Sequence, residues 1–381
     1  MKKNIVQFLY SFGPMLLSLM LLQLIVLPEL YRRDVDLYLK FNYLMYVPLL
    51  FVHVLNTACY NVVVISDSGK NKYDVSIFFY IAIVYAFFVF AVGILQDQVD
   101  LLIVVFLCSL MLADTAMNLL RIAEKDRTIA KMLLIQTTVF IVLFYSNFDV
   151  FIAYALANIT SCLYSIRSLF RCNIITVSFS FRGIRKVSVG YLISSAIPTI
   201  NRYVDKVFVL IALTAQSSSH VLPILSICGL IMLPTSSATK VIIRSVSFHG
   251  SINNILPKVI SVIPILFLFL YLGTSFGLSF VYGFEAEPLI LMAICTLKTI
   301  SLIELFVFSM LAHRVDLHRG ISRVSRYLSL TFFGFIALIW MLGIEFSEMS
   351  IWTLPVYLFI SVVMFLISTG GKYGSVTKKH C

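Results

Sequence analysis

Charged residues are scarce in this sequence, and their scarcity excludes most classes of soluble protein. Only 12% of the 381 residues are Asp, Glu, Lys or Arg, whereas 60% are hydrophobic. An ordinary soluble domain has about a quarter of its residues charged, and it needs them to cover its surface. The composition therefore excludes a soluble globular protein, a disordered chain and a disulfide scaffold, and it predicts an integral membrane protein.

Catalytic and metal-binding signatures are also nearly absent. The chain has no HExxH, no phosphate-binding P-loop, no GxSxG and no Cys/His cluster with metal-ligand spacing. Its seven Cys are odd in number and fall in predicted spans or cytoplasmic segments, where disulfides are not expected. The sequence predicts no catalytic residue, no cofactor and no metal.

Long apolar stretches, in contrast, fill most of the chain. A membrane-spanning helix needs about 17 to 25 predominantly apolar residues. We therefore predict an all-α integral membrane protein with about twelve transmembrane helices, at residues 5–28, 41–66, 75–95, 101–120, 128–146, 150–170, 189–213, 221–240, 257–282, 287–312, 328–344 and 351–369. The external loops are short, and the longest runs from Glu29 to Lys40.

The basic residues are distributed unevenly between the two sides of these spans. Of 29 Lys and Arg residues, 23 lie at one set of span ends and three, Arg32, Arg33 and Lys40, lie at the other. Cytoplasmic ends of membrane proteins are enriched in Lys and Arg. The distribution predicts that both termini are cytoplasmic, and it explains the net charge of +11 without nucleic acid as a partner.

The layout of the spans predicts two similar halves. A basic cytoplasmic linker at 173–188 separates a six-helix half at 1–172 from a second at 189–381. Pro14 and Pro198 are offset by 184 residues, and Pro48 and Pro234 by 186. Matching breaks of this kind are typical of hinges near a transporter's binding region, although Pro is common in membrane helices by chance. Halves with even numbers of spans would be related by a pseudo-two-fold axis along the membrane normal.

Six ionisable side chains fall well inside predicted spans. Each costs about 2.5–3.5 kcal/mol at the bilayer centre when unpaired, so they must pair or line a wet cavity. They are three acids and three bases: Asp114, Arg202, Asp205, Lys206, Lys298 and Glu304.

The seventh span carries three of the six on one face. Arg202, Asp205 and Lys206 share this face with Ser195, Pro198 and Thr199. One interpretation is an anion-binding wall, in which Arg forks two phosphate oxygens and Lys adds a compact charge. The other is an internal pair between Arg202 and Asp205 that fixes helix packing.

Polar faces also occur on three other spans. Lys298, Ser301 and Glu304 lie on an arc of the tenth span, and Asp114 shares a face of the fourth span with Asn118 and Arg121. These carboxylates fit either ion coupling, with a proton or sodium, or structural pairing. The second span carries one polar face, which predicts a substrate cavity or interhelical hydrogen bonds; it consists of His53, Asn56, Thr57, Tyr60 and Asn61.

The stretch from Tyr191 to Leu213, YLISSAIPTINRYVDKVFVLIAL, resembles the seventh span of the Wzx-type polysaccharide-repeat (O-antigen or capsule) flippases of the multidrug/oligosaccharidyl-lipid/polysaccharide exporter superfamily. Those proteins have a Pro, then small and polar residues, then an acid–base pair that leads into an apolar run, and Asp205-Lys206 matches that pair. The Gly- and Tyr-containing turn that follows in the family is TAQSSSH here. The size and the layout of two six-span halves also fit.

The resemblance implies a flippase, not an enzyme, in the cell inner membrane. It would move an undecaprenyl-pyrophosphate-linked oligosaccharide to the outer leaflet, with membrane lipids, a coupling ion and a polysaccharide polymerase as further partners. A cationic cavity would use Arg202, Lys206 and Lys298. Two alternatives stay open: a cation-coupled drug or solute antiporter, and a polyprenyl-phosphate-dependent glycosyltransferase or polymerase, for which the external pair Asp34 and Asp36 would be the acidic site.

Overall fold

The computed structural model describes residues 13, 16–66, 73–95, 101–123, 125–170, 175–177, 203–246, 252–312, 334, 338, 341–342 and 346–370. These residues are predominantly helical, which agrees with the predicted all-α class. The chain divides into two compact units, Met1–Ile200 and Asn201–Cys381. The predicted halves, 1–172 and 189–381, and the pseudo-two-fold axis between them stay predictions.

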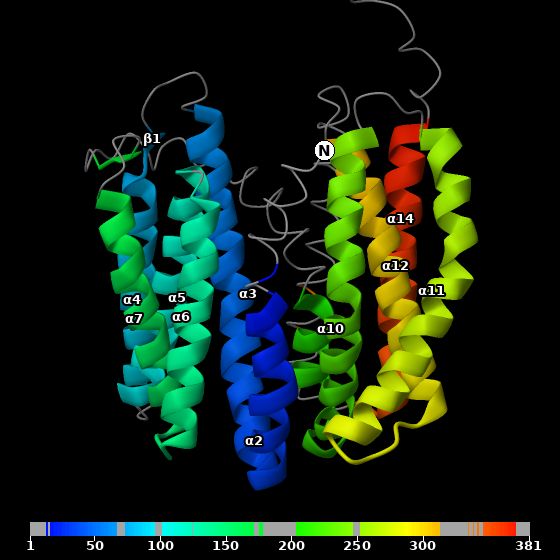
Figure 1. The fold of residues 1–381 in the computed structure, drawn as a ribbon, viewed down its shortest axis with the longest axis horizontal. Coiled ribbons are helices and arrows are strands. Elements are labelled where there is room, and N and C mark those ends of the chain that lie inside the picture. The colour runs from blue at the N-terminus through cyan, green and yellow to red at the C-terminus, as the bar shows by residue number, and fades with distance from the viewer. Residues whose placement is uncertain are drawn as a thin grey trace, which may run out of the picture. The chain divides into compact units, whose positions relative to one another are not determined.

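The N-terminal unit consists of long helices and one minimal sheet (Figure 1). Its helices are η1 (Leu22–Val26, a π-helix), α2 (Leu27–Arg33), α3 (Val35–Ser66), α4 (Ser76–Leu95), α5 (Leu101–Ile122), α6 (Asp126–Tyr145) and α7 (Val150–Phe170). Its strands are β1 (Tyr73–Asp74) and β2 (Ile175–Thr176). α5 packs against α3 and α7, and α6 packs against α7.

The C-terminal unit is described over fewer residues. It has a helical segment at 203–212, then α10 (Ala215–Val246), α11 (Ile252–Val281), α12 (Pro288–Ala312), a short 3-10 helix η3 (Glu348–Trp352) and α14 (Thr353–Gly370). α12 packs against α10, α11 and α14, and Figure 1 shows α11, α12 and α14 running alongside one another.

Six of the described helices are long and apolar enough to cross a membrane. They are Val35–Tyr60, Leu101–Ile122, Arg127–Tyr145, Val150–Leu169, Ala215–Met232 and Ser261–Val281, and Ser76–Ala91 and Glu348–Met364 are shorter apolar helices. Each overlaps a stretch that the sequence predicts to be a span. The chain is therefore compatible with a membrane-embedded protein, whereas the number twelve stays a prediction.

The sequence predicts an external loop from Glu29 to Lys40, and the structure corrects this prediction, because most of these residues are helical. α2 continues to Arg33 and α3 begins at Val35, so Asp34 alone is extended, with φ −159° and ψ 108°. The backbone N–H of Leu37 donates to Asp34 Oδ1 at 3.0 Å, the bond of a helix N-cap. Because helical hydrogen bonds need no apolar side chains, the helices run past the apolar stretch that hydropathy detects.

Aromatic rings hold the N-terminal helices together. Phe41 of α3 lies among rings from α5, α6 and α7, and its centroid is 6.1 Å from Phe106 and 5.7 Å from Tyr154. Phe140 and Tyr154 meet edge to face at 5.0 Å. All four rings are buried. Edge-to-face aromatic pairs contribute about 0.5–1.5 kcal/mol beyond their buried area, so this cluster fixes the four helices relative to one another.

Two backbone pairings join segments that the sequence places on the same side of the membrane. β1 pairs in parallel with β2, both in predicted cytoplasmic segments. Phe346 donates its N–H to the carbonyl of Ala212 at 2.8 Å, and Leu213 bridges Phe346, where the sequence predicts external ends. Both pairings agree with the predicted alternation of sides, and the orientation of the termini stays a prediction.

The predicted hinge prolines have mixed outcomes. Pro48 lies within α3, which is continuous from Val35 to Ser66. Pro234 lies within α10, which is continuous from Ala215 to Val246. Pro14 and Pro198 are outside the described residues. A hinge role for the four stays a prediction.

Candidate functional site

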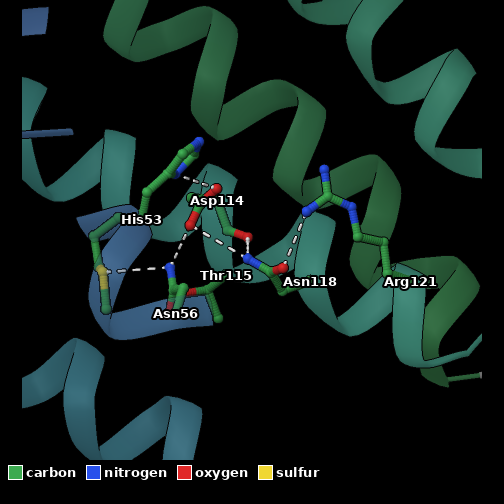
Figure 2. A network of polar contacts seen from close by, with 7 residues as sticks. His53, Asn56, Asp114, Thr115, Asn118 and Arg121 are labelled. Carbon is green, nitrogen blue, oxygen red and sulfur yellow. Dashed lines mark hydrogen bonds and ion pairs between the residues drawn. The ribbon is translucent and has the colours of Figure 1, made fainter. Parts of the chain in front are cut away.

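A buried polar network joins α3 and α5 in the N-terminal unit (Figure 2). Its centre is Asp114, which is 2% exposed. The amide of Asn56 donates to Asp114 Oδ2 at 2.7 Å, and that of Asn118 donates to the same oxygen at 3.3 Å. Nδ1 of His53 lies 2.8 Å from the other oxygen, Oδ1. Both carboxylate oxygens of Asp114 therefore face N–H groups or an imidazole nitrogen.

Hydrogen bonds at their far ends fix the orientation of the two amides. Thr115 Oγ1 donates to Asn56 Oδ1 at 3.3 Å, and the guanidinium of Arg121 donates to Asn118 Oδ1 at 3.2 Å. Since a guanidinium can only donate, Asn118 must present its oxygen to Arg121 and its NH₂ to Asp114. Asn118 thus connects the negative charge of Asp114 to the positive charge of Arg121.

The two polar faces predicted on the second and fourth spans therefore meet in the structure. His53 and Asn56, predicted to bind substrate, and Asp114, predicted for ion coupling or pairing, belong to one network. Tyr60, from the same predicted face, packs instead against an apolar cluster that includes Val62 and Phe78. The roles predicted for His53, Asn56 and Asp114 stay predictions.

A second polar chain crosses α5, α6 and α7, and sequence reasoning missed it. Gln136 of α6 donates to Asn158 Oδ1 at 2.5 Å, and Asn158 donates to Ser109 Oγ of α5 at 3.0 Å. Asn158, Ser161 and Ser165 are fully buried on α7. Their spacing of three and four residues on an apolar helix was the available signal. Such bonds between membrane helices contribute about 0.6 to 2 kcal/mol each.

In the C-terminal unit, a partly buried ion pair links two elements far apart in the sequence. Lys298 Nζ of α12 is hydrogen-bonded to Asp205 Oδ2 of the segment 203–212. Their side chains are 16% and 4% exposed. Asp205 Oδ1 accepts the backbone N–H of Lys206 at 2.9 Å. The sequence assigned Lys298 to substrate and considered Arg202 as the partner of Asp205, but Arg202 lies outside the described residues.

The third buried carboxylate, Glu304, lies farther along α12. Ser361 of α14 donates to Glu304 Oε1 at 3.1 Å, and both residues are buried. Ser301 of the predicted arc turns its hydroxyl to the carbonyl of Leu297 in its own helix at 2.9 Å. Glu304 thus contributes to the contact between α12 and α14, and its coupling or pairing role stays a prediction.

Within the described part of the chain, no group of three or more His, Cys, Asp or Glu residues could hold a metal ion. Comparison of the chain with protein-family models, with curated proteins and with solved structures finds no match.

Proposed function

We propose that the protein is a flippase that moves an undecaprenyl-pyrophosphate-linked oligosaccharide repeat from the cytoplasmic to the outer leaflet for surface polysaccharide synthesis. The observation that carries the proposal is the ion pair of Asp205 with Lys298, buried among apolar helices and adjacent to Lys206. Ionisable residues inside membrane helices are costly, and they occur mainly where a bundle interior or a wet cavity serves substrates or ions.

The excess of bases in this region supports an anionic substrate. Well inside the predicted spans of the C-terminal half there are three bases, Arg202, Lys206 and Lys298, and two acids, Asp205 and Glu304. A pyrophosphate headgroup carries multiple negative charges, and drawing it out of water requires fixed positive partners. Lys298 supports this role because its ammonium group can exchange the carboxylate of Asp205 for a phosphate oxygen without losing charge compensation.

The resemblance of Tyr191–Leu213 to the seventh span of polysaccharide-repeat flippases gives the substrate class. Asp205-Lys206 of that stretch is the same pair whose acid contacts Lys298. In this proposal the pyrophosphate headgroup would meet Lys298, and the polyprenyl chain would stay in the lipid. The alternative functions that the experiments must distinguish from this proposal are drug export and glycosyl transfer.

The test measures the leaflet in which lipid-linked repeat units accumulate. In cells whose own copy is deleted and replaced by Lys298→Gln, we expect surface polysaccharide to fall at least tenfold and repeat units to accumulate in the cytoplasmic leaflet. Lys125→Gln is the matched control, because Lys125 is an exposed base outside the helices. Both variants must reach the membrane at wild-type abundance.

Two outcomes would contradict the proposal. Repeat units that accumulate in the outer leaflet would place the defect after translocation, in polymerisation. Absence of lipid-linked repeat units altogether would place the defect in their synthesis, and a glycosyltransferase would then explain the phenotype.

A further inference from the structure

The contact between His53 and Asp114 carries an inference about protons. We propose that these two residues form a proton-binding site within the N-terminal unit, in which the imidazole takes up a proton and the carboxylate holds the resulting imidazolium. The site depends on the proposed function only for what its proton does in transport.

The imidazole of His53 and the carboxylate of Asp114 are in direct contact. Nδ1 of His53 lies 2.8 Å from Asp114 Oδ1, so an imidazolium at His53 would form an ion pair with the carboxylate. Histidine is the side chain whose charge changes most readily near neutral pH, and Figure 2 shows the ring of His53 beside the carboxylate of Asp114. The side chain of His53 is 17% exposed and that of Asp114 only 3%. A proton from the aqueous side would therefore reach the imidazole before the carboxylate.

The remaining contacts of Asp114 favour a proton over a metal cation. Asn56 and Asn118 direct N–H groups, not oxygens, at Oδ2, and their orientation is fixed by Thr115 and Arg121. Sodium or calcium would need oxygen ligands around the carboxylate, so both amides would have to turn and break these bonds. A proton on His53 requires neither amide to turn, so the bonds of Asn56 and Asn118 to Asp114 stay in place.

Uptake of one proton changes the charge of a balanced network. With His53 neutral, the negative charge of Asp114 is matched by Arg121, which contacts it through Asn118. Protonation of His53 gives the network one net positive charge. Inside a membrane such a charge interacts strongly with other buried charges, and a change of this size can bias a two-state element.

Other titratable groups lie on the helices that surround His53 and Asp114. Arg121 is a charged group that is joined to the pair by hydrogen bonds through Asn118. The acids and bases at the junction of α2 and α3 lie about 28 Å along the helix from His53, since each residue rises 1.5 Å. On the elements that pack against α3 and α5, the charged residues include Asp74 of β1, Arg127 and Lys131 of α6 and Arg167 of α7. The nearest tyrosines and cysteines include Tyr85 of α4 and Cys108 of α5.

The first experiment needs no substrate and so tests the site independently of the proposed function. The full chain, with ¹⁵N-labelled histidine, is placed in lipid nanodiscs and studied by NMR from mildly alkaline to mildly acidic pH. The six histidines are assigned by substituting each in turn with Gln, so that the His53 signal is identified by elimination even if His53→Gln does not fold. We expect this signal to convert to the doubly protonated form.

The Asp114→Asn variant separates a proton site from an isolated histidine. Without the carboxylate, we expect the His53 signal to lose its conversion over the same pH range. The signal of His220, which is exposed on α10, is the internal control and should be unchanged. A His53 that stays neutral in the wild-type chain, or that protonates equally in Asp114→Asn, would overturn the proposal.

The second experiment connects the site to transport. In proteoliposomes loaded with lipid-linked repeat units, we expect an imposed pH gradient to accelerate translocation, and His53→Gln to abolish that acceleration. Protonation of His53 in nanodiscs without translocation of repeat units would retain the site and reject the flippase. Translocation without any effect of the pH gradient in either protein would retain the flippase and reject proton coupling at His53.

Discussion

Asp205 and Lys298 are 93 residues apart in the sequence and form an ion pair in which Asp205 is buried and Lys298 is partly buried. The ion pair connects the segment 203–212 to α12 within the C-terminal unit. Removal of one partner leaves an uncompensated charge in an apolar environment, which costs about 3–5 kcal/mol, whereas removal of both can be nearly neutral.

This pair predicts strong coupling in unfolding experiments. We expect Asp205→Asn and Lys298→Gln each to lower the stability of the detergent-solubilised protein, and the double variant to be more stable than the sum of the two losses implies. Denaturant or thermal unfolding of the four proteins measures the coupling. Additive losses would mean that the two charges do not stabilise each other.

Export by Arg202 variants is a separate prediction, because Asp205 has Lys298 as its partner. We expect Arg202→Lys to keep partial export and Arg202→Gln to lose it, since Lys retains the charge but not the two-pronged fork. The double variant Arg202→Gln with Asp205→Asn should not restore export. Restoration at matched membrane abundance would show that Arg202 only neutralises Asp205 and would retire its substrate-binding role.

Close packing of α11 on α10 depends on Gly277. A Cβ at this position would lie 2.7 Å from Cγ2 of Ile227, whereas a Cβ at Gly229 would meet nothing within 4 Å. We expect Gly277→Ala to destabilise the protein by about 1–3 kcal/mol through overpacking. Gly229→Ala is the matched control and should be neutral or slightly stabilising, because Ala favours helix. Equal melting temperatures of the two variants would contradict this account of the packing.

Asp34 and Asp36, which the sequence predicts to be external, should not be required for glycan synthesis. The carboxylate of Asp34 caps α3, and Asn is an equally good N-cap, so the double change to Asn preserves the helix. We expect near-normal surface glycan in cells that carry it. Loss of glycan at normal protein abundance would instead favour the polyprenyl-dependent glycosyltransferase, which uses such a pair.

The side of the membrane on which each loop lies is a further prediction. Both backbone pairings constrain it, because paired segments must lie on the same side. Reporter fusions should read cytoplasmic at Lys72, Lys125, Arg185, Arg323 and Lys379 and external at Asp34, Asp97, Ser217 and Glu345. The pairing of β1 with β2 requires Lys72 and Thr176 to share a side, whatever the absolute orientation. An external C-terminus would remove the arrangement of twelve spans and its pseudo-two-fold axis.

The positions of most described helices were predictable from composition alone. Runs of apolar residues mark where a helix can satisfy its backbone in lipid, and α4, α5, α6 and α7 begin and end within a few residues of the predicted limits. The start of α3 was not predictable in this way, because Asp34 ends one helix and caps the next within a polar sequence. Hydropathy detects apolar runs long enough to cross the bilayer, but it does not detect a capping residue such as Asp34.

The sequence by itself determined which side chains could not face lipid. Helical spacing placed His53 with Asn56 on one face and Asp114 with Asn118 on another, because the cost of burying polar groups is a property of each residue and its neighbours along the helix. Only the tertiary structure decided that these two faces meet, and that Lys298 is the partner of Asp205. Those choices depend on how helices distant in the chain pack and rotate against one another, which rings such as Phe41 and Tyr154 fix through contacts that periodicity within one helix does not contain.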